Sequence, residues 1–137
     1  MDEHTTTEQK QHILVVDDSE DMRDLLQRLL ERAGYRVVLA ADGQASLTQA
    51  RLHHPDLVLM DLSLPDLDGW EAVSHLRKMP EFRTTPIIAV TAHVSPQEAE
   101  RALAAGCTTH IGKPFDTRAL LQVVARLLVE GSSTHGL

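Results

Sequence analysis

The segment HILVVDD at residues 12–18 decides the fold, because it joins a continuous apolar run to two adjacent acids. We expect the strand over residues 12–17, and its run ILVV does not alternate apolar with polar residues, which is typical of a strand that helices cover on both faces. The later runs DLVLM at 56–60 and PIIAV at 86–90 share the pattern. Together the three runs predict a central parallel sheet, since parallel sheets are normally buried on both faces.

Two shorter runs complete the expected sheet, namely RVVLAA at 36–41 and THIG at 109–112. Both are rich in β-branched or aliphatic residues, as strands are. Apolar residues at helical spacing follow each of the five runs. The expected helices lie around 22–33, 45–52, 67–79 and 95–106, and after residue 116.

Several helix ends carry local signals. Ser95 before Pro96 resembles an N-cap followed by proline at the first helical position. Gly34 and Gly106 supply C-terminal stops, and Asp116 is a candidate cap for the last helix. The element order is therefore (βα)5.

Such an order indicates an α/β fold, a doubly wound parallel five-stranded sheet. The flavodoxin-like strand order 2-1-3-4-5 is the common solution for five strands, and we adopt it by analogy. We expect one domain over residues 11–130, with polar tails at 1–10 and 131–137; the second tail could also begin a linker in a longer parent.

Composition limits the possible functions. The 137 residues carry a net charge of −7, which argues against nucleic acid as a partner. Cys107 is the single cysteine, so the chain can form no internal disulfide and no cysteine metal cage. No apolar run approaches the ~20 residues of a membrane span. We therefore expect a cytoplasmic protein with no membrane partner.

The polar residues that end the strands are the candidate site, because ligands of such sheets bind beyond the carboxyl ends of the strands. Asp17 and Asp18 end the first strand, Asp61 follows the third, Thr91 follows the fourth and Lys113 follows the fifth. Taken singly, each has a simpler interpretation: Asp18 or Ser19 could cap a helix, and the lysine and threonine could be ordinary loop residues.

Taken together, these residues predict a metal-assisted phosphoryl acceptor. Neighbouring strand ends lie roughly 5 Å apart, so the carboxylates would repel one another unless a cation bridged them. Mg²⁺ suits an all-oxygen site, and Mn²⁺ is expected to substitute for it. A carboxylate can accept a phosphoryl group, whose oxygens Mg²⁺, Lys113 and Thr91 would then surround.

The segments ILVVDDSEDMR, LVLMDLSLPDLDGWE, IIAVTAH and HIGKPF resemble the receiver domain of bacterial response regulators, over roughly residues 11–129. The resemblance implies that Asp61 is the phosphoacceptor. It implies that Asp18 and Asp61 bind Mg²⁺ directly, that Asp17 binds it largely through water, and that the backbone carbonyl of Ser63 is a further ligand. Lys113 would pair with Asp61 and then with the phosphoryl group, next to a cis Lys113–Pro114 bond.

The resemblance also implies a switch, in which Thr91 moves toward the phosphoryl group and an aromatic residue of the fifth strand rotates behind it. His110 stands at that strand position, where most members have Tyr or Phe. Ser63 and His93 are expected to tune the lifetime of the phosphoryl group. We interpret Trp70 as a packing residue and Cys107 as inert.

By this resemblance we expect a standalone receiver that takes its phosphoryl group from a histidine kinase or a histidine phosphotransfer protein. It would signal to a downstream protein through altered contacts, and would catalyse only its own phosphorylation and dephosphorylation. Its docking surface would include Met22, Ser19, Pro114 and Phe115.

Three alternatives remain open. The first is a receiver cut from a hybrid histidine kinase, and the second is a degenerate receiver that binds partners without phosphorylation. The third is an Asp-nucleophile phosphohydrolase. Enzymes of that kind place a second acid two residues after the nucleophile, where this chain has Ser63.

Overall fold

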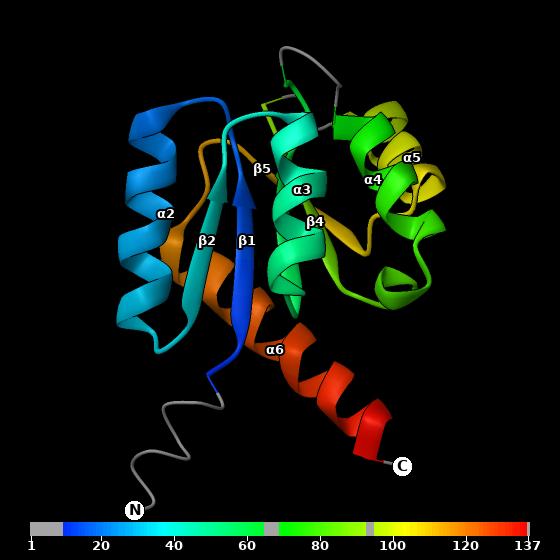
Figure 1. Cartoon of the computed structure of the whole chain (residues 1–137). Coiled ribbons are helices and arrows are strands. Elements are labelled where there is room, and N and C mark those ends of the chain that lie inside the picture. Colours follow the sequence, from blue (N-terminus) through cyan, green and yellow to red (C-terminus); the bar gives the residue numbers. More distant parts are fainter. Residues whose placement is uncertain (1–9, 65–68, 93–94, 137) are drawn as a thin grey trace, which may run out of the picture.

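The computed structural model describes residues 10–64, 69–92 and 95–136 and shows one parallel sheet between two layers of helices (Figure 1). The sheet has the order β2-β1-β3-β4-β5. Its strands are β1 (His12–Val16), β2 (Arg36–Ala40), β3 (Leu57–Asp61), β4 (Ile87–Thr91) and β5 (Thr109–Gly112). The helices are α2 (Glu20–Arg32), α3 (Gly43–His53), α4 (Gly69–Lys78), α5 (Pro96–Ala105) and α6 (Thr117–Gly136), and a 3-10 turn, η1, spans Pro80–Phe82. The expected fold class and strand order are confirmed.

The two faces of the sheet bury separate apolar clusters, because successive side chains of a strand point to opposite faces. Ile13 and Val15 pack in one cluster with residues of α2 and α6. Leu14 and Val16 pack in the other with residues of α3, α4 and α5. The unbroken apolar run of β1 thus serves both layers, as the sequence predicted.

The strand register brings the polar strand ends together. Val16 of β1 pairs with Met60 of β3, so that Asp17 and Asp61 leave the sheet side by side. On the other side of β3, Asp61 pairs with Val90, the residue before Thr91.

Helix ends follow the predicted signals. The Ser19 hydroxyl caps α2 by accepting from the Met22 amide at 3.2 Å. Ser95 caps α5 in the same way, and that helix ends at Gly106, whose φ is +117°. Asp116 Oδ1 accepts from the Arg118 amide at 2.9 Å at the start of α6.

Two features differ from those expected, and one expected boundary is not described. Helix α4 begins at Gly69 within the described residues, whereas the expected start near Leu67 lies outside them. The turn η1 follows α4 directly and was not foreseen. Helix α6 continues to Gly136 where we expected a polar tail, because no proline stops it and a glycine within a helix costs only about 1 kcal/mol. Of the expected N-terminal tail, only Lys10 is described.

None of the helices in the described parts of the chain combines the length and apolarity needed to cross a membrane.

The described ends of α4 are tied to α5 and its following loop. At the start of α4, Trp70 packs on the core, and the Arg101 guanidinium of α5 lies 4.4 Å from its ring centre. At the other end, Arg77 donates to the carbonyls of Gly106 at 2.8 Å, Phe82 at 2.7 Å and Thr85 at 2.7 Å. Burial of the guanidinium lowers the pKa of Arg77. This arginine therefore joins α4 to the two connections that lead into β4 and β5.

We expect the Arg77→Met variant to lose about 3 kcal/mol of unfolding free energy, because four backbone carbonyls, those named above and that of Arg83, lose a charged donor. Urea denaturation followed by circular dichroism measures the change. Arg28→Met is the matched control: Arg28 is exposed on α2, and its loss should change the unfolding free energy by no more than about 0.5 kcal/mol. Equal effects of the two substitutions would contradict the structural role of Arg77.

Candidate functional site

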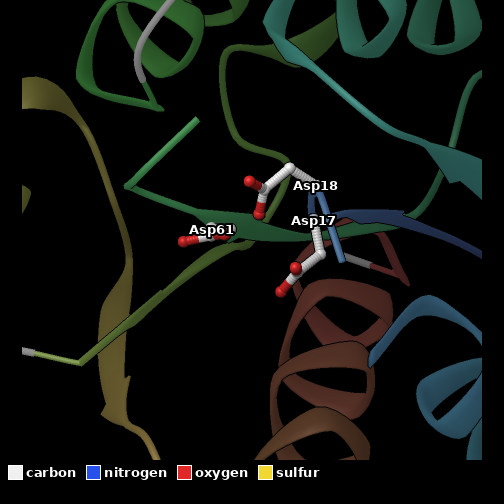
Figure 2. Close-up of side chains that lie close together, drawn as sticks. All are labelled: Asp17, Asp18 and Asp61. Carbon is white, nitrogen blue, oxygen red and sulfur yellow. The ribbon is translucent and has the colours of Figure 1, made fainter. Parts of the chain in front are cut away.

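Three carboxylates gather at the carboxyl edge of the sheet, where β1 and β3 end (Figure 2). Asp17 and Asp61 are buried, with 2% and 3% of their surface exposed, whereas Asp18 is exposed. One oxygen from each of the three carboxylates lies within 4.8 Å of the others. The acids that the sequence placed at separate strand ends are thus brought together.

Burial, together with the crowding of like charge, weakens the acidity of Asp61. Its pKa is raised, first by burial and then by the neighbouring carboxylates of Asp17 and Asp18. The Ser63 amide, which donates to Asp61 Oδ1 at 2.9 Å, and the ammonium of Lys113 act in the opposite direction. The site without a cation therefore holds more negative charge than its donors neutralise.

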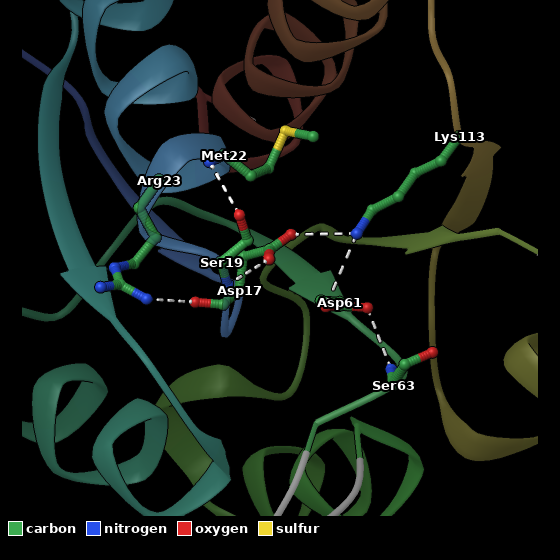
Figure 3. A network of polar contacts seen from close by, with 7 residues as sticks. All are labelled: Asp17, Ser19, Met22, Arg23, Asp61, Ser63 and Lys113. Atoms are coloured by element: carbon green, nitrogen blue, oxygen red, sulfur yellow. Dashed lines mark hydrogen bonds and ion pairs between the residues drawn. The ribbon is translucent and has the colours of Figure 1, made fainter.

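Lys113 reaches into this acidic cluster from the loop after β5 (Figure 3). Its Nζ lies 3.6 Å from Asp61 Oδ2, which is the pair the sequence predicted. It lies closer, at 3.2 Å, to Asp17 Oδ2. The lysine is thus shared between two strand ends. The Lys113–Pro114 bond is cis, as expected.

Thr91 and Ser63 border the acids. Thr91 is buried at the end of β4, and its carbonyl accepts from the Lys113 amide at 2.8 Å. Ser63 is exposed two residues after Asp61 and contacts the acid through its amide. All five residues at the predicted strand ends therefore meet at one edge of the sheet.

Other residues singled out from the sequence lie apart from the acids or are not described. His110 is half-buried in β5, where it pairs with Ala89 of β4. Cys107 is buried, and burial raises its pKa to about 11, so its thiol is almost entirely protonated at neutral pH. His93 lies outside the described residues.

Sequence reasoning missed Arg23. Its Nη1 donates to the backbone carbonyl of Asp17 at 2.8 Å, from the first turns of α2 (Figure 3). The available signal was weak: a basic residue soon after Asp17-Asp18 has the same local pattern as any exposed helix arginine.

The donor set fits a hard divalent cation. Only carboxylate oxygens come from Asp17, Asp18 and Asp61, and Mg²⁺ prefers such ligands while keeping several waters. Zn²⁺ favours nitrogen and sulfur ligands, which these three residues do not offer. The raised pKa of Asp61 gives the same indication, since a bound cation would offset both the cost of burying its charge and the repulsion from the neighbouring acids.

Comparison with known proteins identifies the class of domain. Residues 13–125 match the response regulator receiver domain. The polar-differentiation response regulator DivK of Brucella ovis is 35% identical over 116 residues, which cover 85% of this chain and 94% of that protein. The chain belongs to the response regulator receiver family, a class of signalling domain in two-component systems.

Solved structures agree with this assignment. The chemotaxis protein CheY4 of Vibrio cholerae has a TM-score of 0.83 and 33% identity, over 86% of this chain and 98% of that one. The receiver domain of a sensor histidine kinase from Pseudomonas aeruginosa has a TM-score of 0.81 and 35% identity, over 87% of this chain and 98% of that one. That structure has a magnesium ion coordinated in its active-site cleft.

The raised pKa of Asp61 leads to a prediction about stability. An acid whose pKa is raised by folding binds its proton more tightly in the folded state, so stability falls as pH rises through the folded pKa. In the Asp61→Asn variant, the side chain at position 61 cannot ionise. At pH 7 without divalent cations we expect its unfolding free energy to exceed that of the wild type, and the difference to shrink as pH falls to 3.8, the ordinary pKa of the side chain, and below.

Denaturant titrations at a series of pH values measure this difference. Asp24→Asn, at an exposed acid of α2, is the control for loss of one negative charge. Addition of Mg²⁺ should stabilise the wild type more than Asp61→Asn, because binding to the folded state raises stability. If Asp61→Asn is less stable than the wild type at pH 7 without cations, the result would contradict a raised pKa of Asp61.

Proposed function

We propose that the chain is a phosphoacceptor that receives a phosphoryl group on the carboxylate of Asp61. The donor would be a histidine kinase or a histidine phosphotransfer protein. The observation that carries the proposal is the convergence of Asp61 with Asp17, Asp18 and Lys113 at the edge of the sheet. Family membership supports the same role. Like other receivers of this kind, the chain would work in the cytoplasm.

The transfer is a displacement at phosphorus. An oxygen of the Asp61 carboxylate forms a new bond to phosphorus, and the bond from phosphorus to the donor's imidazole nitrogen breaks. The electron pair of the broken bond stays on that nitrogen. Lys113, already 3.6 Å from Asp61 Oδ2, would neutralise charge on the phosphoryl oxygens, and the Thr91 hydroxyl would donate to one of them. Attack of water on phosphorus later restores the carboxylate and releases phosphate.

We assign Asp17, Asp18, Asp61 and the backbone carbonyl of Ser63 as the residues that hold Mg²⁺, with Mn²⁺ as a substitute. The cation would supply charge neutralisation for the carboxylates and the incoming phosphoryl group. Lys113 alone cannot do this, because one ammonium faces three carboxylates.

Phosphorylation would be read out through protein contacts. The added charge and acceptor oxygens would draw Thr91 and Lys113 toward the phosphoryl group and alter the surface near β5. His110 is the residue of β5 that we assign to this response. The phosphodonor would dock near Ser19, the N-cap of α2, near Met22 of that helix, and near Pro114 and Phe115. Ser63 and His93 would tune the lifetime of the modified state.

One alternative keeps the same chemistry in a different protein context. The similarity to a receiver domain of a histidine kinase from Pseudomonas aeruginosa favours a receiver that works as part of a hybrid kinase. In that case Asp61 would exchange phosphoryl groups within a relay and have no separate downstream target.

We expect the protein to gain one phosphoryl group when incubated with Mg²⁺ and acetyl phosphate, with a bond labile to base. Intact-mass spectrometry measures the gain. Asp61→Ala should show no adduct, because it lacks the accepting carboxylate, whereas Asp24→Ala on α2 should behave as the wild type. An adduct of equal yield in Asp61→Ala would contradict the proposal, and steady turnover of phosphate esters would favour the hydrolase.

A further inference from the structure

Each of the four polar groups of Asp17 has its own hydrogen-bond partner, and Figure 3 shows the partners of its carbonyl and its two carboxylate oxygens. The amide donates to the Ala40 carbonyl of β2 at 3.1 Å. The carbonyl accepts from Arg23 Nη1 of α2 at 2.8 Å. Oδ1 accepts from the Ser19 amide at 2.9 Å, and Oδ2 accepts from Lys113 Nζ at 3.2 Å. Asp17 is therefore held in place before any cation binds.

Arg23 differs from the other partners, because it acts on the backbone between two acids. Its own position is fixed by the first turn of α2, in which its amide donates to the Ser19 carbonyl at 3.0 Å. From there the half-buried side chain turns back across six residues to the Asp17 carbonyl. A guanidinium is a planar donor that loses little freedom when it makes such a contact.

The Asp17 carbonyl belongs to the peptide unit that joins Asp17 to Asp18. That unit is planar and rigid, so fixing its oxygen also fixes the direction in which the chain enters Asp18. Burial holds the side chain of Asp17, but Asp18 is exposed and has no such packing. The place of the Asp18 carboxylate therefore depends on the backbone before it.

We propose that Arg23 is a positioning residue for the cation site. By holding the Asp17–Asp18 peptide, it keeps the Asp18 carboxylate within reach of the Asp61 carboxylate, so that both can bind one Mg²⁺. The inference rests on the proposed cation site but not on the transfer of a phosphoryl group.

Charge and geometry predict opposite effects of Arg23. A positive guanidinium near three carboxylates repels Mg²⁺, so its removal would tighten binding if charge alone mattered. If Arg23 instead positions Asp18, its removal weakens binding. Groups that orient metal ligands typically contribute 10–100-fold to metal affinity, which is more than one screened surface charge contributes. The direction of the change therefore separates the two roles.

The test is a calorimetric titration of Mg²⁺ into the full chain. We expect Arg23→Met to raise the Kd for Mg²⁺ about tenfold or more. Arg23→Lys keeps the charge but has a flexible, compact donor, and should give an intermediate Kd. Arg28→Met removes an exposed arginine from the same helix and should leave the Kd near that of the wild type. Urea unfolding of each variant confirms that the chain is folded.

An unchanged or lower Kd in folded Arg23→Met overturns the inference, even if its stability falls, because Arg23 would then be a structural or merely electrostatic residue. Phosphoryl uptake from acetyl phosphate is measured in parallel. Saturating Mg²⁺ should restore uptake in Arg23→Met, since the accepting carboxylate is intact. Uptake that stays low at saturating Mg²⁺ would also count against a role confined to the cation site.

These outcomes differ from a failure of the proposed function. A wild type that binds no Mg²⁺ overturns the cation site and the role of Arg23 together. A wild type that binds Mg²⁺ but takes no phosphoryl group from any donor overturns the proposed function alone.

Discussion

Repulsion between carboxylates at one edge of the sheet is the constraint on which the site depends. Because β1 and β3 are neighbouring parallel strands in the register Val16 to Met60, Asp17 and Asp61 leave the sheet side by side. Both are buried, and burial of Asp61, together with the charges of Asp17 and Asp18, raises the pKa of Asp61. Lys113 offsets part of this charge and a divalent cation would offset the rest. The fold thus leaves negative charge at the site that a divalent cation would balance.

The scaffold holds these acids through contacts that also build the fold. Ser19 caps α2 with its hydroxyl while its amide donates to Asp17, so a single residue starts the helix and orients the acid. Arg23 fixes the backbone of the same loop from within the helix. On the far side of the sheet, Arg77 fastens α4 to the loop before β5. Rigid strand ends and anchored loops keep charges of one sign close together.

The sequence predicted the fold well, because its signals are local. Every strand lies within one residue of its predicted bounds, since apolar runs mark the strands and caps mark the helices between them. The strand order came from analogy. The five site residues could be found because each lies at the end of a strand or just after it. The contacts of Arg23 and Arg77 could not: Arg77 bonds to a carbonyl 29 residues away, and in sequence Arg23 looks like the exposed Arg28. The partners of a long side chain depend on the tertiary fold, which local sequence patterns do not reveal.

The most direct test of the central claim is to locate the modified residue. Borohydride reduces an aspartyl phosphate to homoserine, so a protein treated with acetyl phosphate and Mg²⁺, reduced and digested can be mapped by tandem mass spectrometry. The account predicts homoserine at position 61, and its loss when a chelator replaces Mg²⁺. Homoserine at positions 17 or 18 instead, or modification of position 61 that does not depend on a divalent cation, would contradict it.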